Sequence, residues 1–341
     1  MKRPVAVVIS DIHYNINTIE LADAALRQAI AKAYKLQVPL IVAGDLHDTK
    51  ANMRAECLTA MINTFQRVAT PTYVLRGNHD QINEKSESHS LEFLKLIDSV
   101  YVLDYFAQSA DFNFIPYQSS VEMFTFYLSK IPKGSTIIMH QGVQGSSAGD
   151  YLQDPTAIDK SLLADYRVIS GHYHTRQDIK CGRPRAGAVG LMSYIGNPYT
   201  LNFGEANDPE KGYRVLNSDG TLDFIPTGLR KHRVIEIEIQ QGDCVATVGD
   251  LVFNNKEDIV KVKVTGTKED LSNVNKAVIS QTLNYNGDFR LELIPLENTA
   301  VLPQDTIVSL YHTLDVIIDS LQNTSNEQKE RLKTLWKGIC A

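Results

Sequence analysis

The sequence predicts an α/β protein: a β-sandwich flanked by helices, then a small α+β unit and C-terminal helices. Three observations support this prediction. Short β-branched runs alternate with helical stretches through the first 230 residues. Strictly alternating strands begin near residue 232, and two amphipathic stretches end the chain. We therefore divide the 341 residues into segments 1–230, 231–300 and 301–341.

Five apolar runs in the first segment predict buried strands: residues 5–10, 39–44, 72–77, 135–140 and 166–171. Between the first two, apolar residues recur at helical spacing from Asn17 to Leu36. Asn17 and Glu20 have the spacing of a capping box at the start of that helix. A similar helix is expected over residues 51–68. Strands that alternate with helices in this way indicate an α/β sandwich.

From residue 232 the hydrophobic pattern changes. Residues 232–239, 258–266 and 287–295 alternate between apolar and polar, as half-exposed strands do. Thr267 and Asp270 then open a helix that carries Leu271, Val274 and Val278 on one face. Together these elements predict a compact α+β unit.

Two amphipathic helices are expected in residues 301–341, and they have two interpretations. They either fold back on their own domain or present apolar faces to a partner protein, as a helix in a groove does. The lone tryptophan, Trp336, lies in the second helix, and interface hot spots are enriched in tryptophan. The partner interpretation is the one we favour.

Composition excludes several classes of protein. The chain is 43% hydrophobic and 22% charged, and no apolar run approaches the ~18–20 residues of a membrane span. The run Val5 to Ile9 is too short for a signal peptide and leads directly into Asp11. The four cysteines form no CxxC pair, which indicates neither a zinc knuckle nor a disulfide framework and favours a cytoplasmic location. The net charge of −6 argues mildly against a surface that binds nucleic acid throughout, but two bound divalent ions would add four charges and leave −2.

Five predicted strands end in residue types that bind metals: Asp11-Ile12-His13, Gly44-Asp45, Gly77-Asn78-His79-Asp80, His140 and Gly171-His172-Tyr173-His174. Ligands at the carboxyl ends of strands in an open α/β sheet meet in one crevice. The two-residue spacing in the first and last motifs allows both side chains of each pair to point to the same side. Each motif alone has an ordinary explanation as a cap, a turn or a core histidine. Their combination favours a metal site.

As an ordered set over residues 5–175, these motifs resemble the signature of the calcineurin-like metallophosphoesterases. The resemblance implies two adjacent metal ions. The first would be held by Asp11, His13, Asp45 and His174, and the second by Asp45, Asn78, His140 and His172. Oxygen and imidazole ligands without thiolate suit manganese, with Mg²⁺ or Fe²⁺ as substitutes. A bridging Asp45 can hold the ions ~3.5–4 Å apart, the separation that two-metal hydrolysis of phosphoesters uses.

The resemblance assigns His79 to transition-state stabilisation and proton donation rather than to metal binding. Asp80 is expected to orient His79 through a hydrogen bond, although a turn or helix cap explains it nearly as well. His47 is a candidate substrate contact, with structural packing as the stronger alternative. Basic side chains after the last motif either line a bound strand or form a solvated loop: Arg176, Arg183 and Arg185.

Three features resemble the SbcD-like double-strand-break repair nucleases of this family, including those encoded by phages. Residues 44–49 are similar to their Gly-Asp-hydrophobic-Phe-Asp-Thr block. Residues 194–198, 203–205 and 211–213 are similar to the stretch that closes their catalytic domain. The layout after residue 230 is also similar, with a capping domain and then a helical pair that docks an SbcC-like SMC-type ATPase.

This likeness implies a manganese-dependent exonuclease with 3′-to-5′ polarity on duplex DNA ends and endonuclease activity on single strands. It also implies a homodimer within an SbcCD-like complex of DNA repair, recombination or replication, and no membrane association. A capping domain suits a nuclease because a long polyanion is held in register by contacts to its phosphates. Two alternatives stay open: a small-molecule or protein phosphoesterase of the same fold, and an inactive binding scaffold, which would typically have lost some of these ligands.

Overall fold

The computed structural model describes residues 2–49, 52–83, 88–147, 154, 156–182, 190–240, 243–246, 258–272, 274–283, 287–296 and 329–330. The chain divides into two compact units. The first comprises Met1–Ile235, Leu251–Lys261 and Gly287–Arg290, and the second comprises Glu236–Asp250, Val262–Asn286 and Leu291–Ala341. Among the described residues, no helix is both long and apolar enough to cross a membrane. The helices predicted for 301–341 lie outside the described residues, except for a short helical piece at 329–330.

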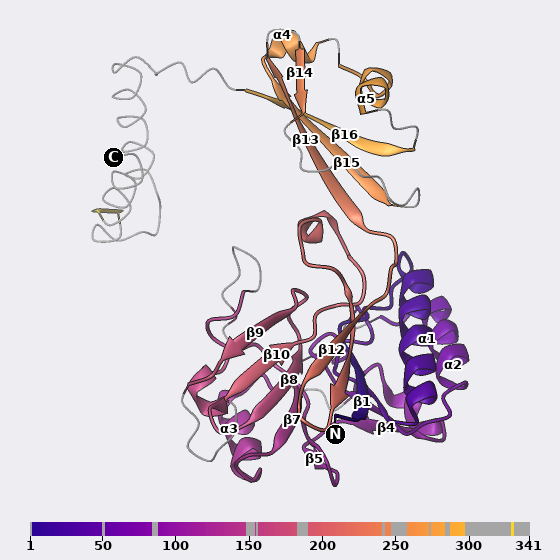
Figure 1. The fold of residues 1–341 in the computed structure, drawn as a ribbon, viewed down its shortest axis with the longest axis vertical. Helices are drawn as coiled ribbons and strands as arrows, with labels where there is room; N and C mark the ends of the chain where they lie inside the picture. The colour runs from indigo at the N-terminus through magenta and orange to yellow at the C-terminus, as the bar shows by residue number, and fades with distance from the viewer. Residues whose placement is uncertain are drawn as a thin grey trace. The chain divides into compact units, whose positions relative to one another are not determined.

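The first unit contains two six-stranded sheets (Figure 1). The first sheet has the order β12-β11-β1-β2-β3-β4. Neighbours from β1 to β4 are parallel, whereas β11 runs antiparallel to β1 and β12 antiparallel to β11. The strands are β1 (Pro4–Ile9), β2 (Leu40–Val42), β3 (Thr72–Leu75), β4 (Val100–Leu103), β11 (Gly212–Asn217) and β12 (Leu222–Pro226).

The second sheet has the order β5-β6-β7-β8-β10-β9. Its inner neighbours, from β6 to β10, are parallel, and the edge strands β5 and β9 are antiparallel. The strands are β5 (Ala107–Gln108), β6 (Asn113–Ile115), β7 (Thr136–His140), β8 (Arg167–Gly171), β9 (Gln177–Lys180) and β10 (Leu191–Tyr194). The five strands expected in this part of the sequence are therefore present as β1, β2, β3, β7 and β8.

Helices cover the outer faces of the two sheets. Helices α1 (Ile19–Leu36) and α2 (Ala55–Phe65) lie side by side on the first sheet (Figure 1). Helix α3 (Val121–Ser129) packs on the second sheet. Three short 3₁₀ helices, η1 (Glu92–Leu96), η2 (Lys160–Leu163) and η3 (Phe203–Glu205), lie between strands. The result is an α/β fold with two mixed sheets and few helices, as predicted.

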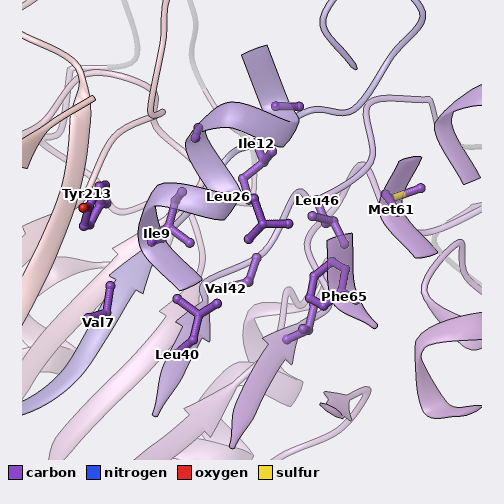
Figure 2. Close-up of a cluster of buried hydrophobic side chains, with 14 of the residues drawn as sticks. Val7, Ile9, Ile12, Leu26, Leu40, Val42, Leu46, Met61, Phe65 and Tyr213 are labelled. Atoms are coloured by element: carbon purple, nitrogen blue, oxygen red, sulfur yellow. The ribbon is translucent and has the colours of Figure 1, made fainter. Parts of the chain in front are cut away.

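Alternating residues of the central strands enter different cores. Val7 and Ile9 of β1 pack with Leu26 of α1 and Phe65 of α2 (Figure 2). The intervening Ala6 and Val8 belong to a core between the sheets, together with residues of β2, β6, β7, β8 and β11. Because both faces of β1 are buried, apolar residues are favoured at every position of the strand. Each fully buried large apolar side chain contributes about 1.5–3 kcal/mol to the free energy of unfolding.

The start of α1 differs from the prediction. The residue that caps the helix is Thr18, and its side chain makes no capping hydrogen bond, so the capping box predicted at Asn17 and Glu20 is wrong. The Thr18 hydroxyl instead donates to the carbonyl of His13, 2.8 Å away. The helix start is thus used to hold the loop that follows β1.

A third sheet, of four strands, has the order β14-β13-β15-β16. Its strands are β13 (His232–Gln240), β14 (Asp243–Ala246), β15 (Ile259–Gly266) and β16 (Phe289–Pro295). Thr267 and Asp270 form a capping box, but the helix that they open is short: α4 (Lys268–Leu271) ends before α5 (Lys276–Leu283). This break explains why Leu271 is buried whereas Val278, predicted on the same helical face, is 39% exposed.

Candidate metal centre and active site

The carboxyl ends of β1, β2, β3, β7 and β8 bring the seven predicted metal ligands together. In two groups, the candidate ligand atoms all lie within 4.8 Å of one another: Asp11, His13 and His174 in one, and Asp45, His140 and His172 in the other. Asn78 joins the second group, because its Oδ1 lies 3.1 Å from His140 Nε2 and 2.9 Å from His172 Nδ1. Without Asn78, each group contains three of the four residues that the resemblance assigned to one metal ion, and Asp45, assigned to both, lies in the second group with its Oδ2 3.9 Å from His13 Nε2.

The loops that carry these residues have an unusual backbone. Asp11, His13, Asp45 and His172 all have positive φ angles, of 53°, 51°, 51° and 96°. Such conformations cost non-glycine residues of order 1–3 kcal/mol each and persist only when the surroundings enforce them. Here the loops hold one another: the amide of His13 donates to the carbonyl of Asp45, and the amide of His172 donates to the carboxylate of Asp11, 3.0 Å away.

Two glycines allow the loops to approach closely. A Cβ on Gly77 would lie 2.1 Å from Asp45 Oδ1. A Cβ on Gly171 would lie 1.9 Å from Ser10 Oγ and 2.4 Å from the carbonyl oxygen of Ala43. Both distances are far below van der Waals contact, so any larger residue at these positions would displace the loops that hold the site.

Each of the four candidate histidine ligands has one ring nitrogen beside a hydrogen-bond acceptor. The pairs are His13 Nδ1 with Asp48 Oδ1 at 3.2 Å, His140 Nδ1 with the Ala43 carbonyl at 2.8 Å, His172 Nε2 with Asp154 Oδ2 at 3.1 Å, and His174 Nδ1 with Glu205 Oε1 at 2.8 Å. Because an acceptor requires the proton on the nitrogen that faces it, the other ring nitrogen of each histidine presents a lone pair to the site.

In the site, acceptors therefore face acceptors. His13 Nε2 and His174 Nε2 lie 3.0 Å apart, and His140 Nε2 lies 3.2 Å from Asp45 Oδ2. Such contacts are repulsive unless positive charge lies between them. At His140 a proton can supply that charge: burial would lower its pKa, but the charge of Asp45 and a hydrogen bond to the Asp45 carboxylate raise it to about 9. The donor set of imidazole, carboxylate and amide oxygen therefore fits divalent cations.

Comparison with known proteins agrees with this chemistry. The family model for calcineurin-like phosphoesterases matches residues 5–176, half of the chain. The protein belongs to this family. It is thus a metallophosphoesterase, a phosphoester hydrolase of a family that depends on a dinuclear metal centre.

Two viral proteins that carry the name "Putative phosphoesterase" are similar to this metallophosphoesterase. Protein 244L of Invertebrate iridescent virus 6 is 28% identical over 254 residues, covering 68% of this chain and 84% of its own. Protein 078R of Invertebrate iridescent virus 3 is 23% identical over 341 residues, covering 95% of this chain and 94% of its own. One crystal structure matches over 67% of this chain and 100% of its own, with 14% sequence identity and a TM-score of 0.40. A likeness this weak carries no argument.

His79 lies at the edge of the metallophosphoesterase centre. Its ring packs edge-on against His13 with 4.9 Å between ring centroids, and its Nδ1 lies 2.8 Å from the carbonyl oxygen of Asp48. That carbonyl requires the proton on Nδ1, which leaves Nε2 on the opposite edge of the ring for contact with substrate. The centre is open on this side, since the side chains of Asp48 and His174 are 38% and 31% exposed.

Asp80 has different partners from the expected ones. It is fully buried and accepts hydrogen bonds from the backbone amides of Gly77 at 2.8 Å, His47 at 3.0 Å and Asp45 at 3.1 Å. Burial and the charge of Asp45 raise the pKa of Asp80 to about 6. Asp80 thus joins the loops after β2 and β3, whereas the ring of His79 is held by the Asp48 carbonyl.

The predicted substrate contacts have unequal positions. His47 is 1% exposed, which favours the packing alternative over a substrate contact. Arg176 is half-buried, with its guanidinium carbon 4.0 Å from the ring centroid of Phe224 on β12. Arg183 and Arg185 lie outside the described residues.

A further histidine–carboxylate cluster is an ion-pair network rather than a metal site. His89 Nδ1 accepts from the amide of Leu91, 3.2 Å away, so Nε2 carries the proton and faces Asp104, 2.8 Å away. Lys95 also contacts Asp104, at 2.6 Å, and Glu92, at 2.9 Å. A nitrogen that carries a proton cannot bind a metal ion.

Sequence reasoning did not find the three carboxylates beside the ligand histidines. Asp48 lies within residues 44–49 and Glu205 within residues 203–205, two segments that resemble the SbcD-like nucleases, but neither residue had an assigned role. Asp154 lies in no motif. These contacts depend on long-range folding, since Glu205 is 31 residues from His174 and Asp154 is 18 residues from His172.

Proposed function

We propose that this metallophosphoesterase is a manganese-dependent nuclease that degrades DNA from duplex ends, 3′ to 5′, with endonuclease activity on single strands. The convergence of histidine nitrogens and carboxylate oxygens at the carboxyl ends of the strands is the observation that carries the hydrolytic part of this proposal. The choice of DNA is supported by the likeness to SbcD-like nucleases in two parts of the sequence: residues 44–49, and the stretch formed by residues 194–198, 203–205 and 211–213.

Those two segments have a physical connection to the site. Asp48, in the first, contacts both His13 and His79. Glu205 and Asn197 belong to the second. The side-chain amide of Asn197 donates a 2.8 Å hydrogen bond to Glu205, and Glu205 contacts His174. The parts of the sequence that resemble the nucleases are therefore the parts that support the proposed ligands.

The seven clustered side chains would hold two Mn²⁺ ions, with Asp45 between them. When bound, such ions supply charge to stabilise the phosphoryl oxygens and activate the attacking water. As an imidazolium that keeps its Nδ1 proton on the Asp48 carbonyl, His79 would deliver the proton of Nε2 to the leaving oxygen and become neutral. Arg176 would bind a neighbouring phosphate of the DNA strand.

The proposal extends to partners. An SbcC-like ATPase would dock on residues 301–341, and a second copy of the chain would pair through the helices of the first hundred residues. Co-expression with such an ATPase tests the docking: full-length protein should co-purify with it, and a chain ending at residue 302 should not. Retention of the ATPase by the shortened chain would contradict this assignment.

One experiment tests the catalytic proposal. End-labelled duplex DNA, a chromogenic phosphodiester and a panel of nucleotides are incubated with wild type and His79→Ala, with Mn²⁺ or with chelator. We expect manganese-dependent release of nucleotides from the duplex by wild type, and strong loss of cleavage with intact metal binding in His79→Ala. Robust turnover of nucleotides without DNA cleavage would establish the small-molecule phosphoesterase instead. Full metal occupancy without hydrolysis of any ester would establish the scaffold.

A further inference from the structure

Asp154 has contacts that point to a specific role at the metal centre. Its Oδ2 lies 3.1 Å from His172 Nε2. Its Oδ1 accepts hydrogen bonds from the amide of Thr156 at 2.8 Å and from the Thr156 hydroxyl at 2.6 Å. The hydroxyl of Tyr173 also points at Oδ2, 3.4 Å away. With Oδ1 saturated by Thr156, the carboxylate is fixed so that its other oxygen faces the histidine.

The loop after β7 is shaped to admit this carboxylate. A Cβ on Gly142 would lie 1.9 Å from Asp154 Oδ2 and 2.9 Å from the Tyr173 hydroxyl. Gly142 does not have the positive φ that usually explains a glycine. A larger residue here would displace the Asp154 carboxylate or the Tyr173 hydroxyl, so glycine at this position provides space for them. Gly142 follows the candidate ligand His140 by two residues, so the loop that makes room for the Asp154 carboxylate also carries a candidate metal ligand.

His172 presents the opposite ring nitrogen to the site from the other three histidines. It turns Nδ1 toward Asn78 Oδ1, 2.9 Å away, whereas His13, His140 and His174 turn Nε2 into the site. Nδ1 presents a lone pair only when the proton is on Nε2. The carboxylate of Asp154 stabilises that tautomer and also holds the ring in place.

The two ligand groups differ in the partners of their histidines. In the first group, His13 and His174 face the carboxylates of Asp48 and Glu205. In the second group, His140 faces a backbone carbonyl, so among the described residues Asp154 is the one carboxylate that supports a histidine there. Loss of Asp154 should therefore affect one metal position and spare the other.

We propose that Asp154 is a positioning residue that orients His172 and sets the affinity of the second metal position. This inference rests on the proposed dinuclear centre, but it concerns metal binding and not the choice of substrate. Carboxylates that hold a ligand histidine typically contribute 10–100-fold to metal affinity, by fixing the ring and raising the basicity of its free nitrogen.

The test is a Mn²⁺ titration of full-length wild type and Asp154→Asn by calorimetry, with bound metal counted by elemental analysis after gel filtration. We expect wild type to bind two ions. Asp154→Asn should bind one ion with unchanged affinity and the other about 10–100-fold more weakly. The matched control is Asp159→Asn, which makes the same charge change at a carboxylate that contacts the amide of Ser161. It should match wild type.

The outcomes separate the inference from the proposed function. Two ions bound with wild-type affinities by Asp154→Asn would overturn the role of Asp154 and leave the metal centre standing. A wild-type protein that binds no pair of ions would overturn both. If circular dichroism shows that Asp154→Asn does not fold, Thr156→Ala decides. It removes the hydroxyl that fixes Oδ1 and should weaken one ion several-fold, and an unchanged titration would overturn the inference.

Discussion

Replacement of Glu205 by glutamine should destabilise the metal-free protein measurably. Glu205 is 8% exposed, and its Oε1 lies 2.8 Å from His174 Nδ1. Its Oε2 accepts hydrogen bonds from the Asn197 amide at 2.8 Å and the backbone of Leu201 at 3.0 Å, and Lys211 Nζ is 3.4 Å away. Glutamine has the same shape but removes the charge and turns one acceptor into a donor.

The magnitude follows from the pKa of Glu205. Burial would raise it, but the hydrogen bond from His174 and the charge of Lys211 lower it from 4.5 to about 2. That difference corresponds to about 3 kcal/mol of stability at neutral pH. Lys211 keeps a 2.6 Å contact with Asp208, so the glutamine variant leaves its ammonium compensated in part. We therefore expect a loss of about 2–3 kcal/mol.

The sign of the pH dependence provides a second check. Because the folded-state pKa lies below the unfolded-state value, the stabilisation is complete above about pH 4.5 and is lost as the pH falls toward 2. Urea unfolding of chelator-treated wild type and Glu205→Gln should thus differ by about 2–3 kcal/mol at pH 7 and by less below pH 4. Glu210→Gln, an exposed change on the same loop, is the control. A difference under about 0.5 kcal/mol at pH 7, or one that grows on acidification, would refute the reasoning.

Three further outcomes are expected. Removal of divalent ions should lower the unfolding temperature. Mn²⁺ at about 100 times its dissociation constant should then add about 2.7 kcal/mol to the free energy of unfolding. An unfolding temperature that chelator does not change in a calorimetric scan would contradict the proposed centre. Gly171→Ala should cost about 1–3 kcal/mol by denaturant unfolding and abolish binding of two ions, because its Cβ would meet Ser10 Oγ at 1.9 Å and the Ala43 carbonyl at 2.4 Å. A variant of wild-type stability with two bound ions would show that the loops can separate without harm. Arg176→Ala should weaken binding of long DNA in fluorescence anisotropy but leave hydrolysis of a chromogenic ester unchanged; equal effects on both substrates would place Arg176 in the metal centre rather than along the strand.

The sequence was sufficient to predict the strands that carry the ligands because their signals are local. β1 and β7 are unbroken apolar runs, and each ends at a polar motif that the sheet brings to one edge. Parallel pairing of β1 with β2 and of β7 with β8 then forces those motifs together. Local patterns and one topological rule were enough to predict that Asp45, His140 and His172 lie together.

Other features had no local signal. β11 lies between β1 and β12 and is buried along its length, but Arg214 and Asn217 interrupt its apolar pattern, so it was not predicted. The contacts of Asp154 and Glu205 arise only when distant loops meet. For Asp80, proximity in the sequence was misleading. Its neighbour His79 is held by the Asp48 carbonyl, and Asp80 itself accepts from backbone amides up to 35 residues away.

The left-handed backbone at Asp11, His13, Asp45 and His172 has an evolutionary consequence. Glycine would occupy each of these four conformations without steric penalty, so a chain selected only to fold would gain by discarding the side chains that make it an enzyme. In homologues that no longer need to hydrolyse phosphoesters, these four positions should therefore be substituted first, and the substitutions should increase the stability of the fold. At these four positions, the residue that would best stabilise the fold differs from the residue that catalysis needs.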